Sequence, residues 1–319
     1  MTEIDEAATS STSTPPPPVR ILIINPNTSQ PMTDALKPVV QGLGISGVQY
    51  TFFTSPTPGI PSINSPADAA RSADICLPHL LPLVPHHDCF LVACYSQHPL
   101  VARLKAECAA VAAAATQGPE GSGARKYVTG IFEASVLASL ALLRDSVPES
   151  VPDDGTSARS SAAGTARTAG GDGSRPAFGI VSTGKVWEEA LQTAVEEFLG
   201  CPTTTTRTSP FVGCETTGLN ASELHDLPAQ EVRRKMMDAT KRLLLRGANT
   251  DGDGDDENRL VSRVQAICLG CAGMVGLDSA VRTACVEALG DKRGREVYIV
   301  DGVKAGVGTL YGLARGGFS

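Results

Sequence analysis

The chain has little positive charge, few aromatic residues and no long hydrophobic run. Its 319 residues include 27 Lys and Arg against 34 Asp and Glu, for a net charge of −7, and 4% are aromatic. Proteins that bind nucleic acid neutralise phosphates with a basic face and often stack bases on aromatic rings, so the composition excludes that class. No apolar run approaches the roughly 18 residues that span a bilayer, so we expect no contact with a membrane.

The first residues lack the features of a targeting segment. Residues 1–18 are acidic at the start and then rich in Ser, Thr and Pro, with neither a basic nor an apolar stretch. This composition argues against a secretory or mitochondrial signal. Nine cysteines, an odd number in a chain of this length, fit reduced thiols better than a disulfide framework. The sequence therefore predicts a cytoplasmic protein.

Three segments have compositions that cannot bury enough apolar surface to fold. They are a disordered tail at 1–18, a low-complexity insertion near 145–175 and an acidic insertion at 249–258. About 260 residues remain, which is enough for two compact domains or one large domain.

The remaining residues alternate short apolar runs with longer helical patterns. Eight runs predict strands, at 20–24, 48–53, 88–93, 127–131, 177–181, weakly near 211–213, 264–269 and 296–300. Helical patterns cover 187–199, 229–246, 278–289 and 303–314. This alternation is typical of parallel sheets with crossover helices, and its repetition indicates a duplicated α/β domain.

Two cysteines occupy equivalent places in the two copies of this pattern. Cys94 and Cys271 each follow the third apolar run of their own half. Ligands of open α/β sheets bind beyond the carboxyl ends of the strands, so we expect both thiols to face the cleft between the halves. A helix starting at each thiol would lower the thiol pKa and favour the thiolate. The pair indicates proton transfer across a substrate, whereas the alternative for either cysteine is a buried apolar role.

Seven segments of the core carry a family pattern. They are Ile24–Ser29 with Met32 and Thr33, Pro61–Ser65, Ala93–Leu100, Gly130–Ala134, Gly179–Gly184, Leu269–Met274 and Val300–Val303. Together they resemble the aspartate/glutamate/hydantoin racemase superfamily and, within it, the fungal-type members of the hydantoin racemase branch. The resemblance implies two pseudo-symmetric, flavodoxin-like three-layer domains with parallel sheets and an active site in the interdomain cleft. We assign 19–128 plus 302–319 to the first domain and 129–301 to the second.

The resemblance also implies a racemase or epimerase without a cofactor, in which Cys94 and Cys271 flank the substrate carbon. Racemisation removes a proton from one face of a stereocentre and returns one to the opposite face, which explains the need for two groups. Backbone N–H groups near Ser96 and at Ala272 and Gly273 are expected to stabilise the enolate oxygen. The substrate would be a small amide such as a 5-substituted hydantoin or an allantoin-like ureide, and a homo-oligomer stays open.

Polar residues follow the first strand of each half. Asn25 and Asn27 lie after the first strand of the chain, and Ser182 and Thr183 lie at the matching place in the second half. We expect them to recognise amide groups of the substrate. The alternative is that the Asn-containing loop forms a turn and caps a helix that starts near Met32.

Two further ionisable residues lie near Cys94 in the sequence. Glu133 begins a helix after the fourth strand, where it could contact the substrate or complement the helix dipole. His98 lies one helical turn after Cys94, where it could support the thiolate or cap a turn before Pro99.

Two patterns imitate metal or redox sites. Cys268 and Cys271 form a C-x-x-C, but the chain has no second such motif and Cys268 lies inside an apolar run. The acidic run from Asp251 resembles a calcium loop, but it places Asp256 where the loop needs glycine and Ser262 where it needs glutamate. We therefore expect no metal site.

Two other functions remain open on the same fold. Relatives in the superfamily also carry out decarboxylation or cis/trans isomerisation in a similar cleft, and a descendant without activity could bind ligand only. Loss of activity on mutating either cysteine would favour racemisation, and two thiols with ordinary pKa values would favour the inactive descendant.

Overall fold

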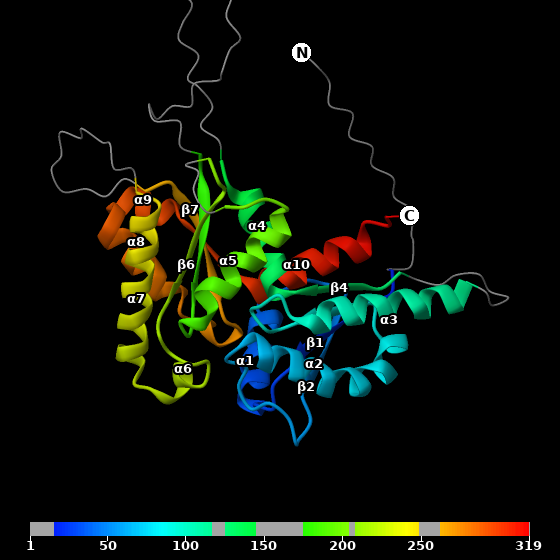
Figure 1. The fold of residues 1–319 in the computed structure, drawn as a ribbon. Coiled ribbons are helices and arrows are strands. Elements are labelled where there is room, and N and C mark those ends of the chain that lie inside the picture. The colour runs from blue at the N-terminus through cyan, green and yellow to red at the C-terminus, as the bar shows by residue number, and fades with distance from the viewer. Residues whose placement is uncertain (1–15, 117–124, 145–174, 204–207, 249–261, 319) are drawn as a thin grey trace, which may run out of the picture.

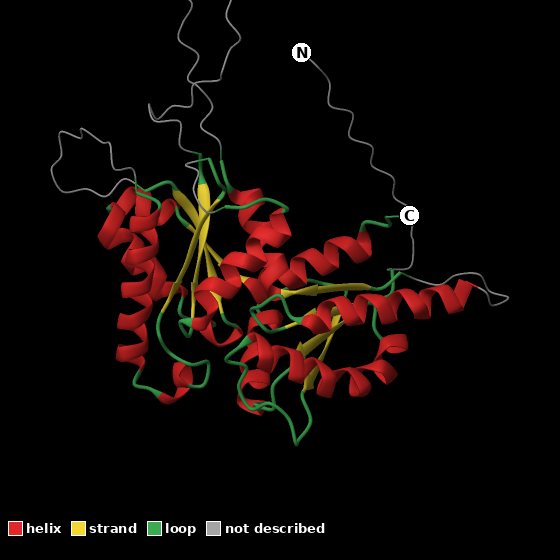
Figure 2. Ribbon diagram, viewed as in Figure 1, coloured by secondary structure: helices red, strands yellow, loops and turns green. Residues whose placement is uncertain are grey.

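The computed structural model describes residues 16–116, 125–144, 175–203, 208–248 and 262–318. The predicted insertion at 249–258 lies outside these residues, and so do all but the last few residues of the predicted tail 1–18 and insertion near 145–175. The described residues form two parallel sheets with helices on both faces, as Figures 1 and 2 show.

Each sheet has four parallel strands in the same order. The first has the order β2-β1-β3-β4 and contains β1 (Val19–Asn25), β2 (Val48–Thr54), β3 (Cys89–Val92) and β4 (Tyr127–Gly130). The second has the order β6-β5-β7-β8 and contains β5 (Ala177–Ser182), β6 (Phe211–Thr216), β7 (Val264–Gly270) and β8 (Tyr298–Asp301). The predicted duplicated α/β fold is confirmed.

Helices cover both faces of the first sheet. One face packs against α1 (Gln30–Gln41) and α10 (Gly302–Arg315), and the other against α2 (Pro66–Leu80), the 3-10 helix η1 (Leu81–His86) and α3 (Pro99–Thr116). Residues Ile21 to Ile24 of β1 are fully buried, which explains their continuous apolar run. The helix predicted near Met32 is α1, and its N-cap Ser29 accepts a hydrogen bond from the Met32 N–H.

The second sheet is covered in the same way. One face packs against α4 (Ile131–Leu142) and α5 (Val186–Leu199), and the other against α7 (Ala229–Arg246) and α8 (Asp278–Leu289). Short helical segments are α6 (Glu223–Asp226), η2 (Ala272–Met274) and α9 (Asp291–Glu296). The last strand therefore starts two residues later than the sequence predicts, because α9 includes Glu296.

The chain crosses between the halves twice. After β4 of the first sheet, α4 packs against β7 and β8 of the second, and after β8 of the second sheet, α10 packs against β3 and β4 of the first. The two crossing helices also pack on each other, so one apolar core extends through both halves. The domain limits given above remain a prediction, and the limit at 128 and 129 falls inside β4, just before the first crossing.

Among the helices that the structure describes, none is both long enough and apolar enough to cross a membrane.

Candidate active site

Cys94 and Cys271 line one cavity at the carboxyl ends of the two sheets. Cys94 lies two residues after β3, and Cys271 directly follows β7, the equivalent strand of the other half. The cavity volume is about 30 Å³, which is room for one or two water molecules. Besides the two thiols, its walls consist of Asn27, Met32, Ile63, Ala93, Tyr95, Thr183, Trp187, Ala221, Gly270 and Ala272. None of these lining residues carries a charge.

Both thiols are held in the protonated form by their surroundings. Loss of water around the sulfur raises the pKa of Cys94 to about 12 and the pKa of Cys271 to about 11. The expectation of a lowered thiol pKa was therefore wrong. Burial is the largest cause, and the expected helix dipoles are missing as well: α3 does not start until Pro99, and Cys271 precedes only the single turn of η2, so no long helix directs its N-terminal dipole at either sulfur.

Each thiol has one polar neighbour from the loop that follows it. The Sγ of Cys94 lies 3.5 Å from the Oγ of Ser96, and the Sγ of Cys271 accepts a hydrogen bond of 3.3 Å from the Gly273 N–H. Both contacts lower the thiol pKa, but by less than burial raises it. Ser96 and Gly273 thus lie beside the sulfurs, and Ala272 lines the cavity.

The two asparagines after β1 have different surroundings. Asn25 is fully buried, and its Nδ2, which carries two N–H donors, lies 3.0 Å from each of three acceptors, the Asn27 Oδ1, the Ser29 carbonyl and the Thr33 Oγ1. Asn27 lines the cavity, and its Nδ2 reaches only the Met32 Sδ, a weak acceptor, at 3.2 Å. Asn25 thus holds the loop in place, while the Asn27 amide is the one that faces the thiols.

Ser182 and Thr183, the equivalent pair in the second half, also have different surroundings. Ser182 is buried and donates to the Gly270 carbonyl at 2.8 Å, which ties β5 to the strand end before Cys271. Thr183 lines the cavity. Its carbonyl accepts a hydrogen bond of 3.0 Å from the Gly218 N–H. Substrate contact by these four residues remains a prediction, for which Asn27 and Thr183 have the favourable positions.

His98 is buried between two neighbours. Its Nδ1 accepts a hydrogen bond of 3.2 Å from the Leu100 N–H, so in the neutral ring Nε2 carries the proton and donates to the Ser72 Oγ at 3.0 Å. Burial lowers the pKa of His98 to about 4. A neutral ring with both nitrogens engaged favours support of the loop over direct action on the Cys94 thiol, which remains the untested alternative.

Glu133 lies in the first turn of α4 with one oxygen unpaired. Its Oε2 is buried and has no hydrogen-bond partner among the described residues. Burial raises the pKa of this carboxyl, although its own backbone N–H and that of Gly130 act in the opposite direction. The carboxylate in turn raises the pKa of the Cys94 thiol. Glu133 therefore acts on Cys94 through its charge, and substrate contact remains a prediction.

The two cysteines of the C-x-x-C have separate environments. Cys268 lies within β7, is fully buried, and has its Sγ 3.0 Å from the Ser139 Oγ of α4, whereas Cys271 lines the cavity. The described residues contain no group of three or more His, Cys, Asp or Glu placed to hold a metal ion. The acidic run that begins at Asp251 lies outside the described residues.

Sequence reasoning missed the side chains of two residues of the site. Tyr95 lines the cavity and ties the loop after Cys94 to α4, because its hydroxyl lies 2.7 Å from the Ser135 Oγ and its ring packs edge-on against Phe132. Trp187 of α5 also lines the cavity. Two features of the sequence could have identified them: Trp187 is the only tryptophan of the chain, and Tyr95 directly follows Cys94.

Solved structures with a similar fold include two allantoin racemases. An allantoin racemase from Pseudomonas fluorescens matches with a TM-score of 0.61 at 19% identity, over 94% of this chain and 93% of that one. The allantoin racemase from Klebsiella pneumoniae matches with a TM-score of 0.59 at 20% identity, over 94% and 89%. At these identities the likeness establishes the two-domain racemase fold.

Part of the sequence matches a known family. Residues 21–147 match the Asp/Glu/Hydantoin racemase family. An uncharacterised protein of Schizosaccharomyces pombe is 29% identical over 297 residues, which are 93% of this chain and 92% of the relative. The family match and these structural neighbours both lie among racemases.

Proposed function

We propose that the protein is a cofactor-independent racemase or epimerase of a small neutral amide, with the Cys94 and Cys271 thiols as opposed acid and base. One observation carries the proposal: the two thiols line the same cavity from equivalent strand ends of the two halves. Groups placed in this way are suited to approach one carbon atom from its two faces.

The reaction removes one proton from the stereocentre and returns another to its opposite face. One thiolate takes the proton from the stereocentre and becomes a thiol, while the electron pair moves onto the adjacent carbonyl oxygen to form an enolate. The opposite thiol then returns a proton to the other face and becomes a thiolate, so the enzyme ends with its protonation states exchanged and ready for the reverse direction. The Asn27 amide and the Thr183 hydroxyl are the candidate donors to the enolate oxygen.

The cavity walls favour an uncharged substrate. A free amino acid would bring a carboxylate and an ammonium group into a space whose described lining offers no charged partner for either. Burying an unpaired charge costs several kcal/mol, whereas an amide ring needs only hydrogen bonds. A 5-substituted hydantoin or an allantoin-like ureide meets this condition and has a carbonyl next to its stereocentre.

The raised thiol pKa values fit the same chemistry. A thiol with a pKa near 11 is a stronger base once ionised than an ordinary thiol, which suits a weakly acidic C–H bond. The corresponding cost is a small population of thiolate at neutral pH.

The test is incubation of the protein with enantiopure hydantoins, allantoin, aspartate and glutamate in heavy water. Optical rotation should decay and deuterium should enter the stereocentre for the neutral amides only. Cys94→Ser and Cys271→Ser should each abolish both signals with unchanged circular dichroism. Cys268→Ser, which removes the buried thiol of the same segment, is the matched control and should remain active. Full racemisation by either cavity variant would contradict the two-thiol mechanism.

A further inference from the structure

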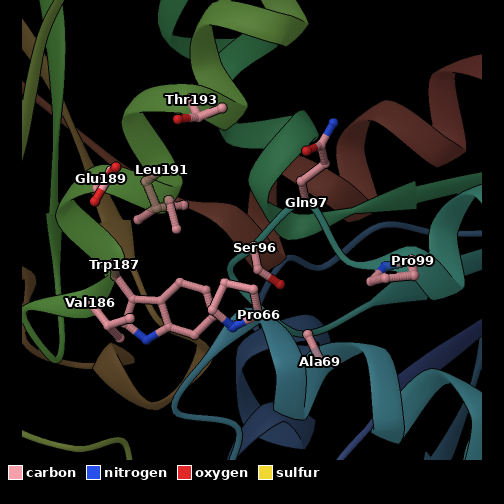
Figure 3. A pocket seen from close by; sticks show the side chains of 11 residues that line it. Pro66, Ala69, Ser96, Gln97, Pro99, Val186, Trp187, Glu189, Leu191 and Thr193 are labelled. Atoms are coloured by element: carbon pink, nitrogen blue, oxygen red, sulfur yellow. The ribbon is translucent and has the colours of Figure 1, made fainter.

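A second cavity adjoins the space between the thiols. Its volume is about 460 Å³, and it lies between α5, the start of α2 and the loop that contains Ser96, as Figure 3 shows. We call this space the side chamber. The residues of its wall used below are Ala69, Ser96, Trp187, Glu189, Ala190 and Leu191.

Two side chains lie in the wall between the side chamber and the thiol cavity. Trp187 lines both spaces, and in Figure 3 its indole extends from α5 toward Ser96. Ser96 lines the side chamber, and its Oγ lies 3.5 Å from the Cys94 Sγ in the thiol cavity. The two spaces therefore share a wall, and that wall touches one of the reacting sulfurs.

The sizes of the two spaces are complementary. The thiol cavity, at about 30 Å³, has room for little more than the reacting carbon and its immediate neighbours. The side chamber has the volume typical of ligand pockets, about 300 to 1,000 Å³. A large substituent on a stereocentre between the thiols needs more room than the thiol cavity offers, and the neighbouring side chamber has a sufficient volume.

The chamber wall also selects by polarity. Ala69, Trp187, Ala190 and Leu191 are the apolar residues of this part of the wall, and Trp187 presents only a small part of its surface, with 4% exposed. The only charged residue of the described lining is Glu189, whose carboxylate repels an anionic group. An indole face favours packing of another aromatic ring.

We infer that the side chamber is a second compartment of the substrate site, which takes an uncharged aromatic substituent of the stereocentre and packs it against Trp187. This inference rests on the proposed function, because it assumes a substrate held between Cys94 and Cys271. Within the side chamber, Trp187 and Ala190 limit the size of the substituent, and Glu189 excludes anionic substituents.

The binding test uses Trp187 as its own probe, because the chain contains one tryptophan. The whole protein is titrated with 5-methylhydantoin, 5-benzylhydantoin and 5-carboxymethylhydantoin while indole emission is recorded. The benzyl compound should shift the emission and bind at least tenfold more tightly than the methyl compound, and the anionic compound should bind most weakly. Equal affinities for all three would overturn the inference.

The kinetic test uses a variant whose larger side chain fills the side chamber. Ala190→Phe should lower kcat/KM for 5-benzylhydantoin at least tenfold and leave the value for 5-methylhydantoin within twofold. The matched control, Ala109→Phe on the exposed side of α3, should change neither value. Glu189→Gln, an exposed change that spares the fold, should raise kcat/KM for the carboxymethyl compound severalfold. Equal losses for methyl and benzyl compounds in Ala190→Phe, or no gain in Glu189→Gln, would contradict the assigned specificity.

The two readouts separate this inference from the proposed function. If no hydantoin exchanges its stereocentre proton but the benzyl compound shifts Trp187 emission and Ala190→Phe abolishes that shift, the chamber assignment stands and the racemase proposal fails. If exchange proceeds equally for methyl and benzyl compounds and is unaffected by Ala190→Phe, the racemase proposal stands and the chamber assignment fails.

Discussion

Gly302, the first residue of α10, packs directly on Ile131, the first residue of α4. A Cβ atom on Gly302 would lie 2.6 Å from the Ile131 carbonyl oxygen, closer than real Cβ atoms approach backbone. Each of these helices leaves its own half of the molecule at this point. The contact is therefore where both crossings of the chain meet, beside the strand end that precedes Cys271.

Gly302→Ala is expected to destabilise the protein by about 1 to 3 kcal/mol, the usual cost of overpacking, because backbone on both sides must shift. It should also lower kcat, since α4 and α10 join the two halves that carry the thiols. Urea unfolding and racemisation rates measure the two effects.

Gly308→Ala is the matched control on the same helix. A Cβ at Gly308 meets nothing within 4 Å, and alanine in an exposed helix interior stabilises by roughly 0.5 to 1 kcal/mol. A loss of stability in Gly308→Ala equal to that of Gly302→Ala would mean that the close packing at Ile131 is not the cause.

The pH dependence of kcat/KM should follow the two thiols of the cavity. The base must be ionised, and with a pKa near 11 for Cys271 and near 12 for Cys94 the thiolate population increases about tenfold for each pH unit below 11. We expect log kcat/KM to rise with a slope near one from pH 7 to pH 9, measured by polarimetry in buffers of constant ionic strength. A plateau that begins below pH 8 would contradict the raised values.

Glu133→Gln should make the Cys94 thiol more acidic. The Glu133 carboxylate raises the pKa of Cys94, so removing its charge lowers that pKa and increases the thiolate at a given pH. The rate of alkylation of the Cys94 peptide by iodoacetamide, followed by mass spectrometry at pH 8.5, should therefore increase.

The matched control for this experiment is Glu107→Gln on α3. The Glu107 carboxylate raises the pKa of Cys108. It should leave the Cys94 alkylation rate unchanged. Equal acceleration in both variants would attribute the effect to general loss of negative charge and not to Glu133.

We expect the protein to lose stability in mild acid because of His98. Burial lowers its pKa to about 4 from an ordinary value of 6.5, so the ring stays neutral in the folded protein while the unfolded chain takes up a proton. Its contribution to the free energy of unfolding is present above pH 6.5 and is lost as the pH falls toward 4, by up to about 3 kcal/mol. Urea unfolding at several pH values should show this decline, and His98→Gln should flatten it.

The exposed His79 of α2 offers the comparison, since its replacement by glutamine should leave the decline as in the unchanged protein. An identical pH profile for the His98→Gln variant would show that other groups carry the acid sensitivity.

The strands and their duplication could be predicted because parallel strands covered on both faces leave continuous apolar runs, as at Ile21 to Ile24. The positions of Cys94 and Cys271 followed from the same pattern. Trp187 could not be found, since its place in both cavities depends on how α5 packs against the other half.

Local sequence also misjudged the electrostatics. The N-terminal dipole of a helix is a short-range feature that sequence reasoning can anticipate, but burial by distant segments determines the thiol pKa values. The same holds for His98, whose partner Ser72 comes from α2 and is 26 residues away along the chain. In each case the deciding neighbour is distant in sequence.

The exchange of α4 and α10 between the halves has a consequence for synthesis on the ribosome. One face of the first sheet, including Leu91 of β3, packs against Gly306 of α10, so closely that a Cβ on Gly306 would lie 2.4 Å from the Leu91 side chain. Since α10 follows β8 of the second sheet, this face stays uncovered until the second half of the fold has been translated. The first sheet therefore cannot complete its packing before α10 has left the ribosome.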